Sequence, residues 1–383
     1  MEIKLKFLIF ANYLPHVINF RGKLLDDISS LGYEIHILAP DLEQYSSEYK
    51  YLLSLGYHLH SIPLQRTGTN PIIDIQTLVC TYKLLLKIKP DAILSYTIKP
   101  IIYGTLAAWL ARVPKRFVLI SGLGYSFQKS DKNGKPSKLQ QVVYTLYKQA
   151  LSKAKLTFFQ NPDDLKLFKD LKLVNNKNKT VVVNGSGVDI DDFDIVDLPK
   201  DFTGKIKPSF LLVARLLKDK GIIEYFEAAK LVKQEHPLSE FHLVGWIDEN
   251  PTAISQTELD SWIASKVIKY WGKLDDVRPA IANSSVYVLP SYREGTSRSV
   301  LEAMSMGRPI ITTDAPGCRE TVVEGKNGFL VPVKSIKELA NAMLNFIEND
   351  SLYEEMGQTS RKIAVEKYDV HKINTYMIRE MRL

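Results

Sequence analysis

The chain has 383 residues, which is enough for two domains of ordinary size. Apolar residues make up 45% and charged residues 24%, a composition typical of a globular protein and one that excludes a disordered or low-complexity chain. The sequence contains no apolar run near the roughly 20 residues of a membrane-spanning helix, and the run at 7–11 is too short for a signal-peptide core. Cys80 and Cys318 lie far apart and fit no metal or redox spacing. We therefore expect a cytoplasmic protein.

The charge is unevenly distributed. Residues 1–200 carry 26 basic and 18 acidic side chains, whereas residues 201–383 carry 24 and 25. Within 112–155 there are ten basic residues and a single acid, Asp131. A segment of one sign favours an anionic partner such as lipid, a lipid diphosphate or nucleic acid. The alternative is a solvated face in a basic protein.

Strand-like and helix-like segments alternate from the N-terminus. Expected strands are 4–11, 34–39, 58–62, 92–96 and 117–120, and expected helices are 21–30, 49–55, 73–88, 101–111 and 142–155. Such alternation predicts an α/β protein with a parallel sheet covered on both faces. The pattern restarts at 209–213 after a polar linker at 197–208. We therefore expect domains at 1–200 and 201–365, followed by a helical segment at 366–383.

The segment 286–306 is the most informative part of the chain. A buried strand, 286–290, is followed by a turn rich in Gly, Ser and Thr and then by a helix at 300–306. Such a turn presents backbone N–H groups at the positive end of a helix dipole, which suits a phosphate. Glu294 and Glu302 flank the turn. The alternative is that Ser299 and Glu302 only form a capping box and that Gly295 is only a turn residue.

Two cations follow the first strand of the second half. Arg215 and Lys220 come directly after 210–213. Fixed cations at this position would stabilise the negative charge that builds on a departing diphosphate. The alternative is that Lys218 and Lys220 are surface charges on a loop.

These segments resemble the retaining glycosyltransferases of the GT-B type, family four. The resemblance is carried by 213–221, 243–245, 294–302 and 309–317, whose order and spacing match the family's nucleotide-sugar half. The N-terminal half is looser. Its segments 96–100, 103–104 and 122–124 look like the branch that extends lipid-linked oligosaccharides for bacterial capsule, O-antigen or protein glycosylation.

The resemblance implies two facing, doubly wound, Rossmann-like domains with a cleft between them. The final helix, 366–383, would cross back onto the first domain. The implied enzyme is a retaining, metal-independent hexosyltransferase without a cofactor. It would move an N-acetylhexosamine or a hexose from a UDP-sugar to a polyprenyl-diphosphate-linked saccharide at the inner face of the membrane.

The resemblance also assigns roles in the donor half. Arg215 and Lys220 would contact the diphosphate, Glu294 the sugar ring and Glu302 the ribose. The remaining donor contacts would come from Gly245, Lys273, Leu274, Gly295, Thr296, Ser297 and Arg298. The sequence shows no metal-binding motif and no catalytic triad. It also marks no carboxylate to act as the nucleophile of a double displacement, so for a retaining enzyme we expect a front-face attack in which the leaving phosphate takes the acceptor's proton.

The N-terminal half would bind the acceptor. The candidate contacts are His16, Asn19, Arg21, Lys99, Gly122 and Gly124. The loop expected at 12–21 lacks the glycine pair that many relatives have there, and 121–124 replaces a histidine that many relatives place after a strand. A purely structural role for His16 is an equal alternative.

The helix 142–155 and the lysine-rich loop 129–138 before it favour contact with an anionic membrane surface. The alternative for the helix is an ordinary amphipathic core helix with a wet basic face. Two other functions remain open from the sequence. One is a related nucleotide-sugar enzyme such as a UDP-sugar 2-epimerase, and the other is a non-enzymatic, basic membrane-binding module. We expect no nucleic-acid partner.

Overall fold

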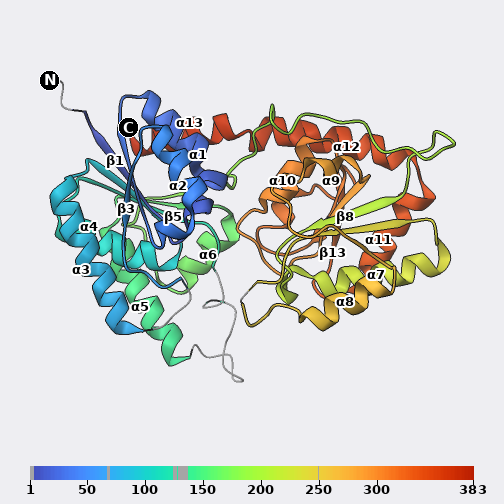
Figure 1. The fold of residues 1–383 in the computed structure, drawn as a ribbon, viewed down its shortest axis with the longest axis horizontal. Helices are drawn as coiled ribbons and strands as arrows, with labels where there is room; N and C mark the ends of the chain where they lie inside the picture. The colour runs from blue at the N-terminus through green and yellow to red at the C-terminus, as the bar shows by residue number, and fades with distance from the viewer. Residues whose placement is uncertain (1–3, 67–69, 124–126, 128–136, 249) are drawn as a thin grey trace. The chain divides into compact units, whose positions relative to one another are not determined.

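A computed structural model describes residues 4–66, 70–123, 127, 137–248 and 250–383 (Figure 1). The chain forms two compact units, the first made of Met1–Ser186 with His371–Leu383 and the second of Gly187–Val370. The chain thus passes between units at 186/187 and 370/371, where the sequence analysis expected 200/201 and 365/366. None of the described helices is long and apolar enough to cross a lipid bilayer.

The first unit contains a seven-stranded sheet in the order β3-β2-β1-β4-β5-β6-β7. All of the ladder pairings between these strands are parallel. The strands are β1 (Lys6–Phe10), β2 (Glu34–Ala39), β3 (His58–Ser61), β4 (Ala92–Tyr96), β5 (Lys115–Ile120), β6 (Leu156–Phe159) and β7 (Thr180–Val182). The five strands expected in this half are therefore present.

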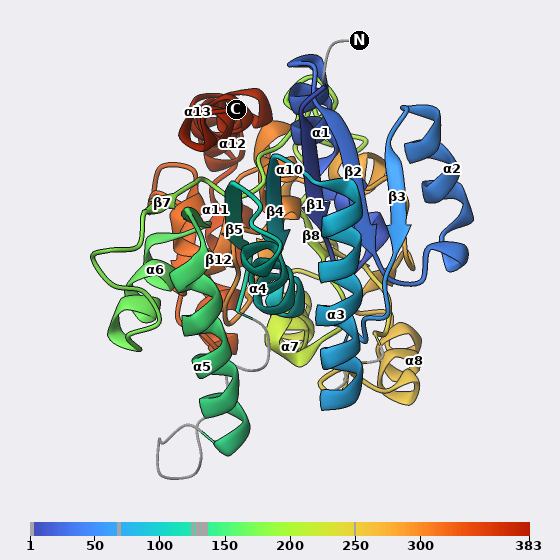
Figure 2. The ribbon, with the colours of Figure 1, turned by 90° about the vertical axis from the view of Figure 1, so that its left-hand side faces the viewer.

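Helices cover both faces of this sheet. Alternate residues of each strand point to opposite sides, and both sets are apolar, so each face packs against helices. The helices are α1 (Leu14–Ser30), α2 (Ser46–Ser54), α3 (Pro71–Ile88), α4 (Thr105–Leu110), α5 (Lys138–Lys153) and α6 (Pro162–Asp170). Phe7 and Ile9 pack against α1, whereas Leu8 and Phe10 pack with residues of α3 and α4. Figure 2 shows α3, α4 and α5 together on one face.

All five helices expected in this half start earlier than predicted, most of all α1. Helix α1 begins at Leu14 rather than at Arg21, so most of the loop expected at 12–21 is helical. Pro15 lies in the first turn, where a missing N–H costs nothing and the fixed φ suits a helix. The helix expected at 101–111 begins as a π-helical turn, Pro100–Gly104, which continues into α4.

The second unit contains a six-stranded sheet in the order β10-β9-β8-β11-β12-β13. Its strands are β8 (Ser209–Val213), β9 (Glu240–Val244), β10 (Lys269–Tyr270), β11 (Val286–Leu289), β12 (Ile310–Thr313) and β13 (Gly328–Val331). Its helices are α7 (Ile222–Glu235), α8 (Gln256–Ala264), α9 (Arg278–Ala282), α10 (Arg298–Ser305), α11 (Ile336–Glu348) and α12 (Ser351–Ile363). The expected fold class is confirmed: both units are doubly wound α/β sheets.

Helix α13 (Val370–Met381) packs against the first unit. Its residues Ile373, Met377 and Met381 join the same buried cluster as the α1 side chains. The amide of Asn374 donates to Asp27 of α1 at 2.8 Å.

The strand order reverses direction once in each sheet, between β1 and β4 in the first and between β8 and β11 in the second. Ligands of such sheets bind outside the carboxyl ends of the strands at this switch point. The loops after β1, β4, β8 and β11 are therefore where functional side chains are expected.

Candidate active site

The loop after β8 carries both predicted cations. Arg215 follows Val213 by two residues, and Lys220 ends a short 3₁₀ helix, Lys218–Lys220. Gly221 then turns the chain into α7 with φ +71°, and a Cβ there would lie 2.1 Å from the carbonyl oxygen of Pro290. Only glycine allows this approach, so the loop after β8 packs directly on the end of β11.

Lys220 and Glu294 form the centre of this site. Lys220 Nζ lies 2.6 Å from Glu294 Oε1, and their side chains are only 16% and 13% exposed. A charge-assisted contact of this length, largely screened from water, fixes both groups in place. The loops after β8 and β11 thus meet at the switch point of the sheet.

Three loops hold the backbone around Glu294. Tyr292 N donates to Asp219 O at 2.9 Å, and Glu294 N donates to Pro316 O at 2.9 Å. A Cβ on Gly317 would lie 2.0 Å from the carbonyl oxygen of Glu294, so the loop after β12 also requires glycine. Glu294 is therefore positioned by backbone contacts rather than by a flexible loop.

Arg215 has a second carboxylate as its partner. Its Nη1 lies 3.1 Å from Asp248 Oδ2, and the guanidinium side chain is 35% exposed. Asp248 follows β9 and was not identified from the sequence. Both predicted cations of the loop after β8 are thus paired with carboxylates.

Glu302 does not cap its helix. Helix α10 begins at Arg298 after Ser297, and the side chain of Ser297 makes no capping hydrogen bond. Ser299 lies inside the helix, so the capping box considered from the sequence is absent. Glu302 instead accepts a 2.7 Å hydrogen bond from Arg298 Nε. Burial raises the pKa of Glu302, and Arg298 opposes that rise.

Hydroxyl groups line the start of α10. Ser299 Oγ contacts Tyr287 Oη at 2.6 Å and Ser297 Oγ at 3.1 Å, and it donates to Val213 O at 3.2 Å. Thr296 Oγ1 donates to the carbonyl of Gly295. These contacts tie the first turn of α10 to the ends of β8 and β11. The N–H groups of that first turn have no intrahelical acceptor, so they can donate to a phosphate.

The remaining donor candidates lie after β9 and β10. A Cβ on Gly245 would lie 1.9 Å from the carbonyl oxygen of Ala214, which explains the glycine beside Arg215. Lys273 is exposed, and its Nζ lies 5.3 Å from the ring centre of Trp246. Leu274 packs against the core of the second unit. Trp246, an exposed aromatic beside Gly245, was missed from the sequence.

In the first unit, the candidates after β1 differ in exposure. Asn19 is exposed on α1, whereas Arg21 is 3% exposed. The Arg21 guanidinium carbon lies 5.8 Å from the ring centre of Tyr96. With the side-chain amide of Gln160 turned so that its oxygen faces Arg21, that oxygen accepts a hydrogen bond from the guanidinium group. The side chain of Arg21 is therefore held inside the first unit, and it would have to move before it could contact an acceptor. The ring of His16 contacts Tyr13 edge-on with centroids 4.7 Å apart.

Lys99 follows β4, on the other side of the switch point in the first sheet. Its Nζ lies 2.7 Å from Asp74 Oδ1, and Tyr103 Oη donates to the other oxygen at 2.9 Å. Gly122, after β5, has φ +141° with open space where a Cβ would be. Gly124 lies outside the described residues.

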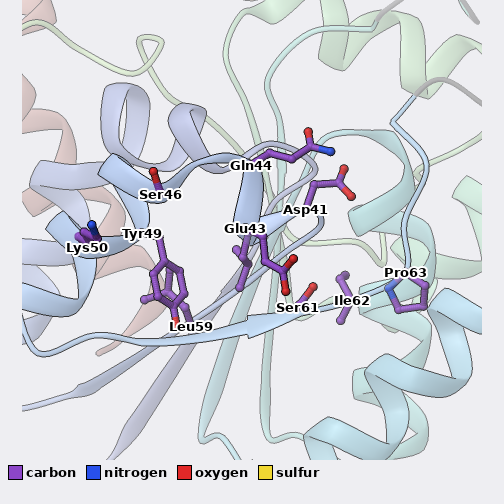
Figure 3. A pocket seen from close by; sticks show the side chains of 11 residues that line it. Asp41, Glu43, Gln44, Ser46, Tyr49, Lys50, Leu59, Ser61, Ile62 and Pro63 are labelled. Atoms are coloured by element: carbon purple, nitrogen blue, oxygen red, sulfur yellow. The ribbon is translucent and has the colours of Figure 1, made fainter.

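A cavity of about 940 Å³ opens at the carboxyl ends of β2 and β3 in the first unit (Figure 3). Its lining residues are Asp41, Leu42, Glu43, Gln44, Ser46, Tyr49, Lys50, Leu59, Ser61, Ile62 and Pro63. Asp41 adopts φ +52°, a left-handed conformation in which Asp is tolerated. The lining combines carboxylates, an amide, hydroxyls and an aromatic ring.

The lining residues all lie within 41–63, but they come from a loop, a helix and an edge strand, and the sequence did not indicate that these segments enclose a cavity. The one local signal is the break at Pro40, where β2 ends. Among the residues that the structure describes, no group of three or more His, Cys, Asp or Glu side chains is arranged to hold a metal ion.

Two family models match the chain. The model described as "Glycosyl transferase 4-like" covers residues 4–161, and the model described as "Glycosyl transferases group 1" covers residues 207–349. Together they span most of both units. Neither describes an epimerase or a non-enzymatic binding module.

Known proteins resemble the chain along most of its length. The N,N'-diacetylbacillosaminyl-diphospho-undecaprenol alpha-1,3-N-acetylgalactosaminyltransferase of Campylobacter jejuni is 28% identical, with 92% of both chains covered. The UDP-Gal:alpha-D-GlcNAc-diphosphoundecaprenol alpha-1,3-galactosyltransferase of Escherichia coli is 28% identical, with 81% of this chain and 80% of the relative covered. The capsular polysaccharide glycosyltransferase CapM of Staphylococcus aureus is 26% identical, with 88% and 86% covered.

Solved structures share the fold. The sucrose-phosphate synthase of Thermosynechococcus elongatus superposes with a TM-score of 0.78 at 16% identity, over 99% of this chain and 98% of the other. HepE of Anabaena, in complex with UDP, superposes with a TM-score of 0.74 at 18% identity, over 99% and 100%. With both halves matched and the fold shared, the chain belongs to the retaining glycosyltransferases of the GT-B type, family four.

Proposed function

We propose that this glycosyltransferase moves an N-acetylhexosamine or a hexose from a UDP-sugar onto a saccharide linked to polyprenyl diphosphate. The observation that supports this most strongly is the Lys220–Glu294 pair at the switch point of the second sheet. In this proposal Lys220 is a cation for the diphosphate and Glu294 a carboxylate for sugar hydroxyls, and they lie on the loops after the adjacent strands β8 and β11. The named substrates of the Campylobacter and Escherichia relatives, both carried on undecaprenyl diphosphate, are consistent with the acceptor.

In this proposal Arg215 and Lys220 bind the donor diphosphate. Negative charge grows on the diphosphate as the anomeric bond breaks, and preorganised cations stabilise it without solvent reorganisation. The N–H groups of Gly295 to Arg298 add donors at the positive end of α10. These groups supply the charge stabilisation, so we propose a reaction that needs neither a metal nor another cofactor.

Two carboxylates take different parts of the donor. Glu294 accepts hydrogen bonds from hydroxyls of the transferred sugar, and its pairing with Lys220 joins the sugar site to the phosphate site. Glu302, held by Arg298, accepts from the ribose. Trp246 and Lys273 lie after β9 and β10, where an exposed aromatic ring can pack on the uracil base.

The chemical step that we propose is a front-face attack. The acceptor hydroxyl approaches the anomeric carbon on the side from which the diphosphate leaves. The C–O bond to the acceptor forms as the bond to the diphosphate breaks, and the hydroxyl proton passes to the leaving phosphate oxygen. The α configuration of the donor is thereby retained, in agreement with the alpha linkages in the names of both relatives.

The acceptor side of the proposal rests on the first unit. Its cavity at the ends of β2 and β3 combines carboxylates, an amide and Tyr49, groups that hydrogen-bond and stack with a sugar. The lining carries two carboxylates, Asp41 and Glu43, against one cation, Lys50, so its net negative charge suits the saccharide part rather than the diphosphate. We propose that the protein works at the inner face of the membrane, where its acceptor is anchored.

The experiment is a transfer assay with a panel of UDP-sugars and a short-chain polyprenyl diphosphate that carries one to three sugars. Transfer from at least one UDP-sugar, unchanged by EDTA, is expected. Loss of all transfer on chelation, with recovery on adding Mg²⁺ or Mn²⁺, would contradict the metal-independent mechanism. Transfer that requires a different nucleotide would contradict the donor assignment.

A further inference from the structure

Helix α3 turns an apolar face to solvent. Its exposed positions recur at helical spacing and are Pro71, Ile72, Ile75, Gln76, Val79, Cys80, Lys83, Leu86 and Lys87. Ile72 and Ile75 are 65% and 61% exposed. The buried face of the same helix includes two polar residues, Thr77 and Thr81. Leu85 and Ile88 are buried on that face too, so α3 is apolar on both faces, whereas a surface helix ordinarily turns charged residues outward.

The neighbouring helices extend this face. Helix α4 lies between α3 and α5 on one side of the first sheet (Figure 2). It exposes Trp109 and Leu110, and the first turns of α5 expose Leu139 and Val142. The three helices thus present aliphatic side chains and an indole ring on one face of a single unit.

The charge on this face has one sign. Helices α3, α4 and α5 are described along their whole length, and together they contain one acidic residue, Asp74. That carboxylate accepts from Lys99 and Tyr103. The exposed basic residues on or beside these helices are Lys83, Lys87, Arg112, Lys138 and Lys148. The surface therefore combines exposed apolar groups with unopposed positive charge.

From this combination we infer that the face formed by α3, α4 and the start of α5 docks on an anionic lipid surface. Helices that lie in a membrane interface bury their apolar side chains at the headgroup boundary and place Lys and Arg against anionic lipid. Tryptophan is enriched at the same depth. The inference rests on the proposed function, in which the acceptor is anchored in the membrane. It adds α3, which the sequence identified only as a helix, to the basic segment 112–155.

Cys80 provides a direct probe, because it is exposed in the middle of this face whereas Cys318, the other cysteine, is buried. A polarity-sensitive fluorophore on Cys80 of the full-length protein should shift to shorter wavelength with phosphatidylglycerol vesicles. It should not shift with phosphatidylcholine vesicles. The control is Cys80→Ser combined with Lys337→Cys, which moves the label to an exposed position on α11 of the second unit. An equal shift from both labels, or none from Cys80, would overturn the inference.

Substitutions on this face test how much its apolar and basic side chains contribute to lipid binding, which is measured by co-sedimentation with vesicles. Ile72→Gln, Ile75→Gln and Val79→Gln together should weaken partition onto anionic vesicles at least tenfold, because they remove the inserted apolar groups. Lys83→Gln with Lys87→Gln should weaken it about 30-fold at low salt, at about a tenfold loss per 1.4 kcal/mol. Matched controls in the second unit are Leu231→Gln, Leu238→Gln and Val323→Gln, and Lys337→Gln with Lys362→Gln. Equal losses in test and control variants would overturn the inference.

A parallel assay separates this inference from the proposed function. On a water-soluble, short-chain acceptor all of these variants should transfer at the wild-type rate. If the wild-type protein transfers sugar to the soluble acceptor but does not bind vesicles, only the inference of a membrane-docking face is refuted. If the wild-type protein binds vesicles but transfers no sugar, only the proposed glycosyl transfer is refuted. Dimerisation in the absence of lipid that the triple glutamine variant abolishes would identify the face as a self-association surface instead, and it too would overturn the inference.

Discussion

Three basic residues in the second unit each form an ion pair with a different carboxylate. Lys220 contacts Glu294, Arg215 contacts Asp248, and Arg298 contacts Glu302. Each pair is largely or partly screened from water, so removal of one member leaves the other uncompensated. Effects of substitution must therefore be separated into lost ligand contact and lost stability.

Arg215→Ala and Lys220→Ala should each slow transfer by ~10²-fold or more, the scale of losing a preorganised charge contact in the transition state. The melting temperature should fall in both variants, because each loses the cation paired with a largely buried carboxylate, so transfer is compared below the melting temperature of both. The measurement is kcat/KM for the UDP-sugar. Lys218→Ala is the matched control, since Lys218 lies on the same loop and is exposed. Equal activity of all three variants would mean that the diphosphate binds elsewhere.

Glu302→Gln should weaken binding of UDP about tenfold while leaving the urea midpoint of unfolding near that of the wild type. The carboxylate is already costly to bury, as its raised pKa indicates, so its neutral isostere does not destabilise the fold. Calorimetric titration with UDP measures the first effect and urea unfolding the second. A large drop in stability with unchanged UDP affinity would assign Glu302 a purely structural role.

At the scale of elements, the sequence predicted best where a pattern is local. The strands at 34–39, 92–96 and 209–213 were predicted with their observed bounds, because continuous apolar runs bounded by turn residues identify buried parallel strands. The start of α1 was wrong, because Pro15 was interpreted as a loop residue although proline suits the first turn of a helix. The capping box that the sequence left open as the alternative for Ser299 and Glu302 does not form, because α10 starts at Arg298.

Contacts between distant segments were not predictable from one sequence. The partner of Arg215 is Asp248, and the partner of Lys99 is Asp74, 25 residues earlier on another helix. Arg21 was predicted as an acceptor contact from its place after the first strand, yet it is nearly fully buried. Which face of a helix is covered depends on neighbours that a local pattern does not contain.

The cavity at the ends of β2 and β3 makes a prediction for the acceptor side. Glu43→Gln should raise the KM for the saccharide acceptor several-fold and leave the KM for the UDP-sugar unchanged, because it removes a charged hydrogen-bond acceptor from one ligand only. Glu48→Gln on α2 is the matched control outside the cavity lining. A rise in donor KM, or the same effect from Glu48→Gln, would contradict a saccharide site here.

At the scale of the whole molecule, each unit contains a histidine that folding keeps neutral. Burial lowers the pKa of His242 on β9 to about 4 and that of His60 on β3 to about 4. Trp271 Nε1 donates to His242 Nδ1 at 3.0 Å, a contact that requires the neutral ring. The unfolded chain protonates these groups near pH 6.5, before the folded chain does.

The free energy of unfolding should therefore be constant above pH 6.5 and fall between pH 6.5 and about 4, as the unfolded state takes up protons first. His242 contributes up to about 3 kcal/mol of this loss, and half-exposed His60 contributes less. Urea unfolding at pH 7.5, 5.5 and 4.5 measures it. Stability that is flat from pH 7 to pH 5 would contradict neutral buried histidines.

The two units divide the work that we propose: the second presents the donor site and the first presents the acceptor cavity and the apolar, basic face. The central claim is transfer with retention from a UDP-sugar to a polyprenyl-diphosphate-linked saccharide. It is tested most directly by nuclear magnetic resonance of the purified product formed from a UDP-α-sugar and a short-chain lipid-linked acceptor. The account predicts a new glycosidic linkage whose anomeric proton has the coupling of an α-linked sugar. A β-linked product, or release of free sugar without any linkage to the acceptor, would contradict it.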